Sequence, residues 1–125
     1  MYSYKRADRV KELVQAEISD IIRTELKDPG IGFVTITGVK LTDDLRNAEI
    51  FVSPMGADDE MARTFRAIRR AASFIRRQLG QRMRMRHVPE LRFTWDHSPE
   101  ESDRINRILH ALEKTSPQRD EDDIE

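Results

Sequence analysis

The chain has 125 residues, with 22 lysines and arginines, 23 aspartates and glutamates, and no cysteine. This length predicts a single domain with an ordinary hydrophobic core. The lack of cysteine excludes a disulfide scaffold, a thiol redox centre, a cysteine nucleophile and a thiolate zinc site. No apolar run is long enough to cross a membrane, and the first residues lack the apolar block of a signal peptide, so we expect a cytoplasmic protein.

The first half of the chain predicts a helix followed by a β-hairpin. Apolar residues recur every three or four positions over residues 4–27, which is typical of an amphipathic helix, and the proline in DPG (28–30) ends it. β-branched residues dominate 31–41, and apolar and polar residues alternate over 47–53, so both segments are predicted strands. The turn-forming sequence TDD at 42–44 separates them.

Residues 58–85 predict a second helical region that is interrupted. Its apolar residues follow steps of four and three and form one buried stripe: Met61, Phe65, Ile68, Ala72, Ile75 and Leu79. On a straight helix Phe74 would lie among the arginines of the opposite side, as an exposed stacking surface. A break near 71–73 would instead return it to the core, and we favour the break because phenylalanine is usually buried. Gly80 is expected to end or loosen the second half.

The end of the chain predicts a strand, a helix and a tail. Leu91, Phe93 and Trp95 alternate in a strand over 91–96. Ser98 as the N-cap, the following proline and Glu101 at the capping-box position predict a helix over 99–114. Residues 115–125 contain one apolar residue and carry a net charge of −4, which predicts a disordered acidic tail.

The order of these elements predicts an α+β fold, with a three-stranded sheet and helices on one face. Two helices joined at a tight junction between two strands are typical of a KH-type RNA-binding module. The glycines lie at 30, 32, 38, 56 and 80, so the GXXG loop of a standard KH clamp is excluded. The small residues Ala71, Ala72 and Ser73 at the junction either let backbone approach RNA or only allow close helix packing.

Charge is distributed unevenly along the chain. Residues 1–62 carry a net charge of −4 and residues 93–125 one of −6, whereas 63–92 hold ten arginines and one acid. Ordinary exposed helices interleave both signs, so this block favours nucleic-acid binding over a merely solvated helix face. The candidate phosphate ligands in the block are Arg63, Arg66, Arg70, Arg76, Arg77, Arg82, Arg84 and Arg86.

Basic residues also cluster in two short segments. Arg82, Arg84 and Arg86 alternate in RMRMRH, and in an extended chain all three would point the same way. Lys5, Arg6 and Arg9 lie at the start of the first helix, where cations oppose the helix dipole. Contact with RNA and fraying of the helix end explain this second cluster equally well.

No catalytic or metal-binding pattern is present. The carboxylate pairs lie at a turn and at helix starts, where capping explains them, and the three histidines share no ligand spacing. The serines lie in no nucleophile elbow, and no glycine-rich phosphate loop occurs. We therefore expect a protein that is not an enzyme and that uses no metal or cofactor. Most aromatic residues occupy core-facing positions, which favours recognition of RNA backbone and shape over base stacking.

Four stretches carry a resemblance to a known family. They are ADRVKELVQAEISDII, DPGIGFVTITGVKLTDDLRNAEIFVS, RRAASFIRRQLGQRMRMRHVPELRF and DHSPEESDRINRIL, and in that order they cover about residues 5–112. The chain resembles the bacterial ribosome-binding factor A family. The resemblance implies one type II KH-like domain over 1–114, with the helix at 99–114 appended to it. It also implies a late assembly factor that binds the free small ribosomal subunit and its rRNA.

Further properties follow from the same resemblance. They are maturation of the small-subunit rRNA near its 5′ end, a link to growth in the cold, and release associated with a ribosome-assembly GTPase. We expect a monomer with no membrane contact. The family has an Ala-x-Gly kink in place of GXXG, and here Ser73 stands where glycine is expected. Either the kink is milder, or the serine hydroxyl satisfies a backbone group freed at the break.

A second class of function remains open from the sequence alone. In the first hypothesis the arginine face docks electrostatically on rRNA phosphates, and the junction fixes the orientation. In the second, the chain is a protein-interaction module whose arginine face meets an acidic protein partner. The acidic tail of the chain itself would cover that face in the unbound state, which predicts tighter RNA binding once residues 115–125 are removed.

Overall fold

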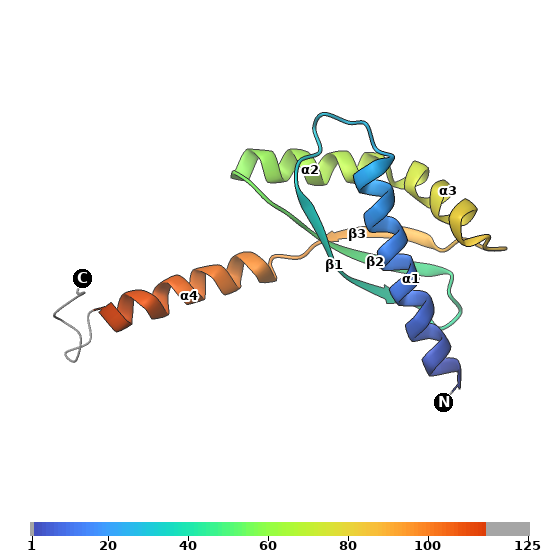
Figure 1. Cartoon of the computed structure of the whole chain (residues 1–125), viewed down its shortest axis with the longest axis horizontal. Coiled ribbons are helices and arrows are strands. Elements are labelled where there is room, and N and C mark those ends of the chain that lie inside the picture. The colour runs from blue at the N-terminus through green and yellow to red at the C-terminus, as the bar shows by residue number, and fades with distance from the viewer. Residues whose placement is uncertain (1, 115–125) are drawn as a thin grey trace.

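The computed structural model describes residues 2–114, and their side chains from residue 8 to residue 113. The elements are α1 (Tyr2–Thr24), β1 (Val34–Leu41), β2 (Asn47–Pro54), α2 (Asp58–Arg70), α3 (Ala72–Met83), β3 (Glu90–Trp95) and α4 (Ser98–Lys114) (Figure 1). This order and the α+β class agree with the prediction from the sequence. The predicted acidic tail at 115–125 lies outside the described residues.

The strands form one sheet in the order β1-β2-β3. β1 and β2 pair antiparallel as the predicted hairpin, and β3 returns parallel to β2 after the two helices α2 and α3. A register shift between Ile36 and Gly38 lets Ile36 and Val39 both face the core, although they are three positions apart. Ala48, Ile50 and Val52 of β2 are buried on the same face, as their alternation predicts.

Helices α1, α2 and α3 pack on one face of the sheet. α1 contacts β1 and α3, α2 contacts β2 and β3, and α3 contacts β3. The core between them consists of branched aliphatic side chains from the helices, Val14, Ile18, Ile21, Ile22, Ile68, Ile75 and Leu79, which meet Ile36, Val39, Ala48, Ile50, Val52 and Phe93 of the sheet. This core leaves the opposite side of α2 and α3, where the arginines are, facing solvent.

The predicted helix runs about three residues beyond the end of α1, and the predicted strand starts about three residues before β1. α1 ends at Thr24, and the N–H groups of Glu25 and Leu26 both bind the Ile21 carbonyl at 2.8 and 3.3 Å. The predicted strand starts at Ile31, whereas β1 begins at Val34. The intervening loop is held to α2 instead of pairing in the sheet, because Thr64 Oγ1 accepts the N–H of Gly32 at 3.0 Å.

The predicted break between the two central helices is confirmed, and it lies at Ala71. This residue has φ −88° and ψ 7°, and its N–H is shared between the carbonyls of Ala67 and Ile68 at 3.1 and 3.0 Å. An L-residue adopts that conformation without glycine, so Ser73 is no obstacle to the kink. The Ser73 hydroxyl makes no hydrogen bond with the described residues. Phe74 is half-buried against the core, as the break predicts.

α3 continues through Gly80 and ends at Met83, so of the two effects expected of Gly80, that of ending the helix is wrong. Gly80 serves another purpose, because Val88 of the following loop packs directly on it. A Cβ at this position would lie 2.6 Å from Val88 Cγ2. Arg84 closes the helix in the left-handed region at φ 51°, with its N–H on the Gly80 carbonyl.

α4 extends away from the sheet and the other helices (Figure 1). It begins at Ser98 itself, so Ser98 is not the N-cap that the sequence predicts. The residues just before Ser98 cap the helix instead. Asp96 Oδ1 accepts the Ser98 N–H at 2.9 Å, and the Glu101 N–H binds the His97 carbonyl at 3.0 Å. Asp96 Oδ2 also accepts the Thr37 hydroxyl at 2.6 Å, and this hydrogen bond lowers the pKa of the carboxyl most strongly. Asp96 thereby ties the start of α4 to β1.

Candidate nucleic-acid interface

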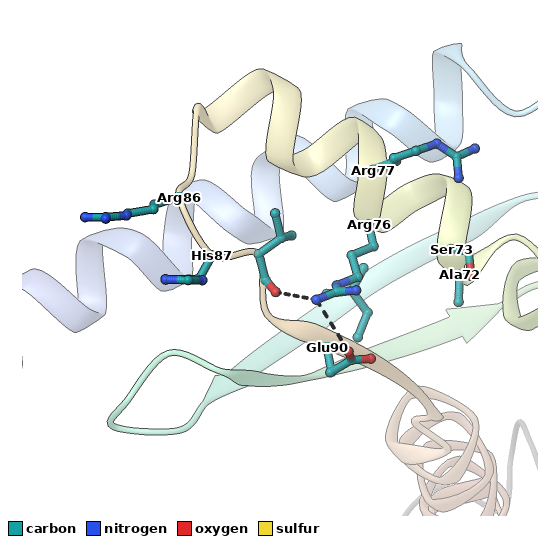
Figure 2. Close-up of a pocket in the computed structure, with 9 residues that line it drawn as sticks. Ala72, Ser73, Arg76, Arg77, Arg86, His87 and Glu90 are labelled. Atoms are coloured by element: carbon teal, nitrogen blue, oxygen red, sulfur yellow. Dashed lines mark hydrogen bonds and ion pairs between the residues drawn. The ribbon is translucent and has the colours of Figure 1, made fainter.

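The kink between α2 and α3 opens onto a pocket of about 500 Å³. Its lining comes from the start of α3, the loop over 84–89 and the start of β3: Ala72, Ser73, Arg76, Arg77, Arg86, His87, Val88, Glu90 and Leu91 (Figure 2). Five of the residues predicted from the sequence therefore come together here. The structure adds His87, which the sequence does not single out because no second ligand lies at a suitable spacing.

The small residues of the junction pack closely against the core, and two of them also line the pocket. Ala71 and Ala72 pack against the hydrophobic core. Ala72 and Ser73 also line the pocket, and the Ser73 side chain is exposed. Without large side chains at these positions, a ligand in the pocket can approach the backbone of the kink.

Arg76 binds the loop that forms one wall of the pocket. Its Nε donates to the Pro89 carbonyl at 3.0 Å and its Nη2 to the Val88 carbonyl at 2.8 Å. Nη2 also lies 3.4 Å from Glu90 Oε2 (Figure 2). These contacts fix the loop against α3 and neutralise the carboxylate that lines the pocket, so Arg77 and Arg86 determine its remaining charge.

Replacing Arg76 with methionine is expected to lower the free energy of unfolding by about 1–3 kcal/mol, because two carbonyls lose a charged donor. Urea denaturation monitored by circular dichroism measures the change. Arg66→Met is the matched control, since Arg66 is exposed and forms no ion pair within the described residues, and it should stay within about 0.5 kcal/mol of the parent. Equal stabilities for the two variants would contradict the anchoring role.

The prediction that Arg82, Arg84 and Arg86 point the same way from an extended chain is wrong. Arg82 lies in the last turn of α3, Arg84 is the left-handed cap, and only Arg86 lies in the loop that lines the pocket. The alternation in RMRMRH resembles a strand locally, but the hydrophobic face of α3 keeps the chain helical as far as Met83.

Arg82 is enclosed by carboxylates of α1 and of the turn that follows it. Its guanidinium reaches Glu17 at 3.1 Å, Asp20 at 2.6 Å and Glu25 at 3.4 Å, and its side chain is 23% exposed. The hydrogen bond from Arg82 is the main reason that the pKa of Asp20 falls below its usual value. Arg82 therefore links α3 to α1, and its charge is already compensated within the protein.

The arginines of α2 remain exposed on the side away from the core. Arg63 and Arg66 form no ion pair with any described residue, and Arg70 lies 3.7 Å from Asp28 Oδ2. Arg77 of α3 is exposed as well, with its guanidinium carbon 5.9 Å from the centre of the Phe74 ring. Arg9 is exposed on α1 and lines none of the pockets beside the kink, while the side chains of Lys5 and Arg6 lie outside the described part.

A second hollow lies on the other side of Ala72, between α2 and β3. It is lined by Phe65, Arg69, Ala72, Leu91, Arg92, Phe93, Thr94 and Trp95. Phe65 and Trp95 pack with their ring centres 5.4 Å apart, and Arg69 lies over Phe65 at 5.8 Å. Arg69 and Arg92 are not among the predicted site residues: Arg69 lies beside the apolar stripe of its helix, not opposite it, and Arg92 is an isolated cation on a short strand. Only the packing of α2 beside β3 brings them together.

Other site chemistry is not indicated within the described residues. No group of three or more histidines, aspartates or glutamates is arranged to hold a metal ion there. None of the helices in residues 2–114 is both long enough and apolar enough to span a bilayer.

Comparisons with known proteins identify the family. The family model described as "Ribosome-binding factor A" matches residues 6–109. The ribosome-binding factor A of Staphylococcus epidermidis is 45% identical over 109 residues, which cover 87% of this chain and 94% of that protein. This chain belongs to the ribosome-binding factor A family. The resemblance that the four sequence stretches indicate is therefore confirmed.

Solved structures of the same family have the same fold. The crystal structure of ribosome-binding factor A from Thermus thermophilus matches with a TM-score of 0.63 and 23% identity, over 73% of this chain and 96% of that one. A Thermus thermophilus homology model fitted into the cryo-EM map of a 30S–RbfA complex matches with a TM-score of 0.59 and 24% identity, over 70% and 91% of the two chains. At 23% and 24% identity, these two matches show a shared fold and nothing beyond it.

Proposed function

We propose that this chain binds the free small ribosomal subunit by docking the arginine surface around the α2–α3 kink on rRNA phosphates. This surface consists of Arg63, Arg66, Arg77, Arg84 and Arg86, which are exposed and form no ion pair with the described residues. It continues into the kink pocket through Arg77 and Arg86. The observation that carries the proposal is that these guanidinium groups are uncompensated, whereas Arg76 and Arg82 are paired.

The chemistry of the surface favours a polyanion with regularly spaced charges. Guanidinium groups bind phosphate oxygens through a planar fork of donors and stay charged at every physiological pH. The overall charge of −1 does not prevent such binding, because the acidic residues lie mainly on other segments. The Thermus thermophilus family member was fitted into a map of its complex with the 30S subunit. The same kind of partner is therefore proposed for this chain.

The finer parts of the proposal follow from family membership. We propose that binding assists a late step of small-subunit assembly, maturation of the rRNA near its 5′ end, with importance for growth in the cold. Release would be associated with a ribosome-assembly GTPase, and the chain would act in the cytoplasm as a monomer that is not an enzyme.

Co-sedimentation with purified free small subunits tests the proposal. We expect binding at about 50 mM salt that weakens by orders of magnitude by about 200 mM, because several phosphate contacts release counterions. Intact 70S ribosomes serve as the comparison particle, and RNase treatment before capture separates the two candidate partner classes. A complex that survives RNase would reject RNA docking in favour of an acidic protein partner. No binding in dilute buffer would reject a binding role of the arginine surface altogether.

A further inference from the structure

Phe33 is the most exposed of the large apolar side chains that the structure describes, with 83% of its surface accessible. Phe33 is thus an exception to the expectation that most of the aromatic residues face the core. Its backbone is nevertheless fixed, because the Phe33 carbonyl accepts the Met55 N–H at 2.9 Å and the next residue, Val34, pairs with Pro54 in the sheet. An exposed ring on a fixed backbone is a preorganised contact surface.

The loop that presents Phe33 is fastened to the arginine side of α2. Thr64, which is 1% exposed, accepts the Gly32 N–H at 3.0 Å and donates to the Gly30 carbonyl at 3.4 Å. Gly30 lies beside Arg63, since a Cβ there would be 3.5 Å from Arg63 Cγ. Phe33 is therefore one residue away from a backbone segment docked on α2, next to Arg63.

The hollow beside Phe33 is largely apolar, and the one basic residue in its lining, Arg23, is already paired with Asp20. It has a volume of about 470 Å³, and its apolar lining includes Ile22, Leu26 and Ile31. Asp28 is the one carboxylate in its lining, and it already binds the Gly30 N–H at 2.8 Å and faces Arg70 at 3.7 Å. An anionic ligand with a flat apolar part would meet no free carboxylate in this lining.

We propose that Phe33 is a stacking platform for an unpaired RNA base whose neighbouring phosphates are held by Arg63 and Arg66. The inference rests on the proposed function and extends it, because it assigns part of the bound RNA to a single-stranded segment. Bases without pairing partners expose a flat face to aromatic side chains, and recognition of this kind usually accompanies a positively charged track for the backbone. The exposed ring and the uncompensated arginines of α2 supply both parts.

The test compares binding of an unstructured single-stranded RNA and of a duplex of equal length by fluorescence anisotropy at low salt. Phe33→Ala should weaken binding of the single strand by about 5- to 100-fold and leave the duplex within about twofold. Phe33→Trp should restore single-strand binding, whereas Phe33→Leu, which keeps apolar surface without a π-face, should not. Ile105→Ala on α4 is the matched control, because it removes another exposed apolar side chain (54%) and should change neither affinity.

The outcomes separate this inference from the function on which it rests. If the wild type binds duplex and single strand but Phe33→Ala binds the single strand equally well, the platform is wrong while RNA docking stands. If Phe33→Leu binds the single strand like the wild type, Phe33 contributes apolar surface without stacking, and the platform is again wrong. If the wild type binds neither RNA in dilute buffer, the platform is wrong, and co-sedimentation with free small subunits then decides whether the proposed function stands. Unchanged thermal unfolding of Phe33→Ala, expected from its exposure, keeps the comparison valid.

Discussion

Replacing Arg66, Arg77 and Arg86 together with glutamate is expected to reduce affinity for free small subunits by about 1,000-fold or more. Each of these guanidinium groups is exposed and forms no ion pair with the described residues, so each is available for a phosphate. A charge-assisted contact is worth about 1.5–3 kcal/mol, and a reversed charge adds repulsion. Loss of these phosphate contacts should also reduce the slope of log affinity against log salt by about three.

The measurement is co-sedimentation over a series of salt concentrations, with thermal unfolding as the check on the fold. The matched control reverses Lys40, Arg104 and Arg107, which changes the net charge by the same amount on β1 and α4. Specific docking predicts that this control keeps most of the affinity. If the two triple variants lose affinity equally, the protein responds only to overall charge and the kink surface has no special role.

Replacing Gly80 with alanine is expected to destabilise the protein by about 1–3 kcal/mol, although alanine normally favours a helix over glycine by about 1 kcal/mol. The new Cβ would lie 2.6 Å from Val88 Cγ2. Valine is stiff about its first side-chain bond, and the Val88 carbonyl is held by Arg76 at 2.8 Å, so the loop cannot yield without losing that contact. The pocket wall should move with Val88, and affinity for small subunits should fall as well.

A double-mutant cycle with Val88→Ala isolates this contact. Removing Cγ2 eliminates the clash, so Gly80→Ala should be neutral or stabilising in the Val88→Ala background, with a coupling energy of about 1–3 kcal/mol. Urea denaturation of the four proteins measures it. A Gly80→Ala protein as stable as the parent would show that the loop over 84–89 is not held against α3 as described.

Local signals are sufficient for the order and the type of the elements. The three- and four-residue spacing of α1 and the alternation of β2 both express a buried face, and the structure buries most of those same residues. The break can be predicted from one aromatic residue, Phe74. On a straight helix its side chain could not reach the core, so the helix must change direction before it. The density of arginine over 63–92 indicates the chemistry of the candidate interface in the same way.

The failures have a common physical origin in contacts distant along the chain. RMRMRH alternates like a strand, yet Arg82 is helical and meets Glu17, Asp20 and Glu25 more than fifty residues earlier. Gly80 resembles a helix terminator, yet it accommodates Val88. Residues 31–33 resemble a strand, yet Thr64 of α2 holds Gly32 out of the sheet. The local sequence around one residue of such a long-range contact contains no information about the distant residue that it meets.

Periodicity, composition and the four family stretches are local properties, and they suffice to predict an α+β fold of the ribosome-binding factor A family with a broken central helix and an arginine-rich block. Which of the arginines are available depends on tertiary packing. The contacts of α3 with α1 and with the start of β3 neutralise Arg82 and Arg76, whereas Arg66, Arg77 and Arg86 stay exposed around the kink. The charge of a segment can be counted from its sequence. Whether each arginine is paired depends on which carboxylates and carbonyls the fold brings within a few ångströms of it.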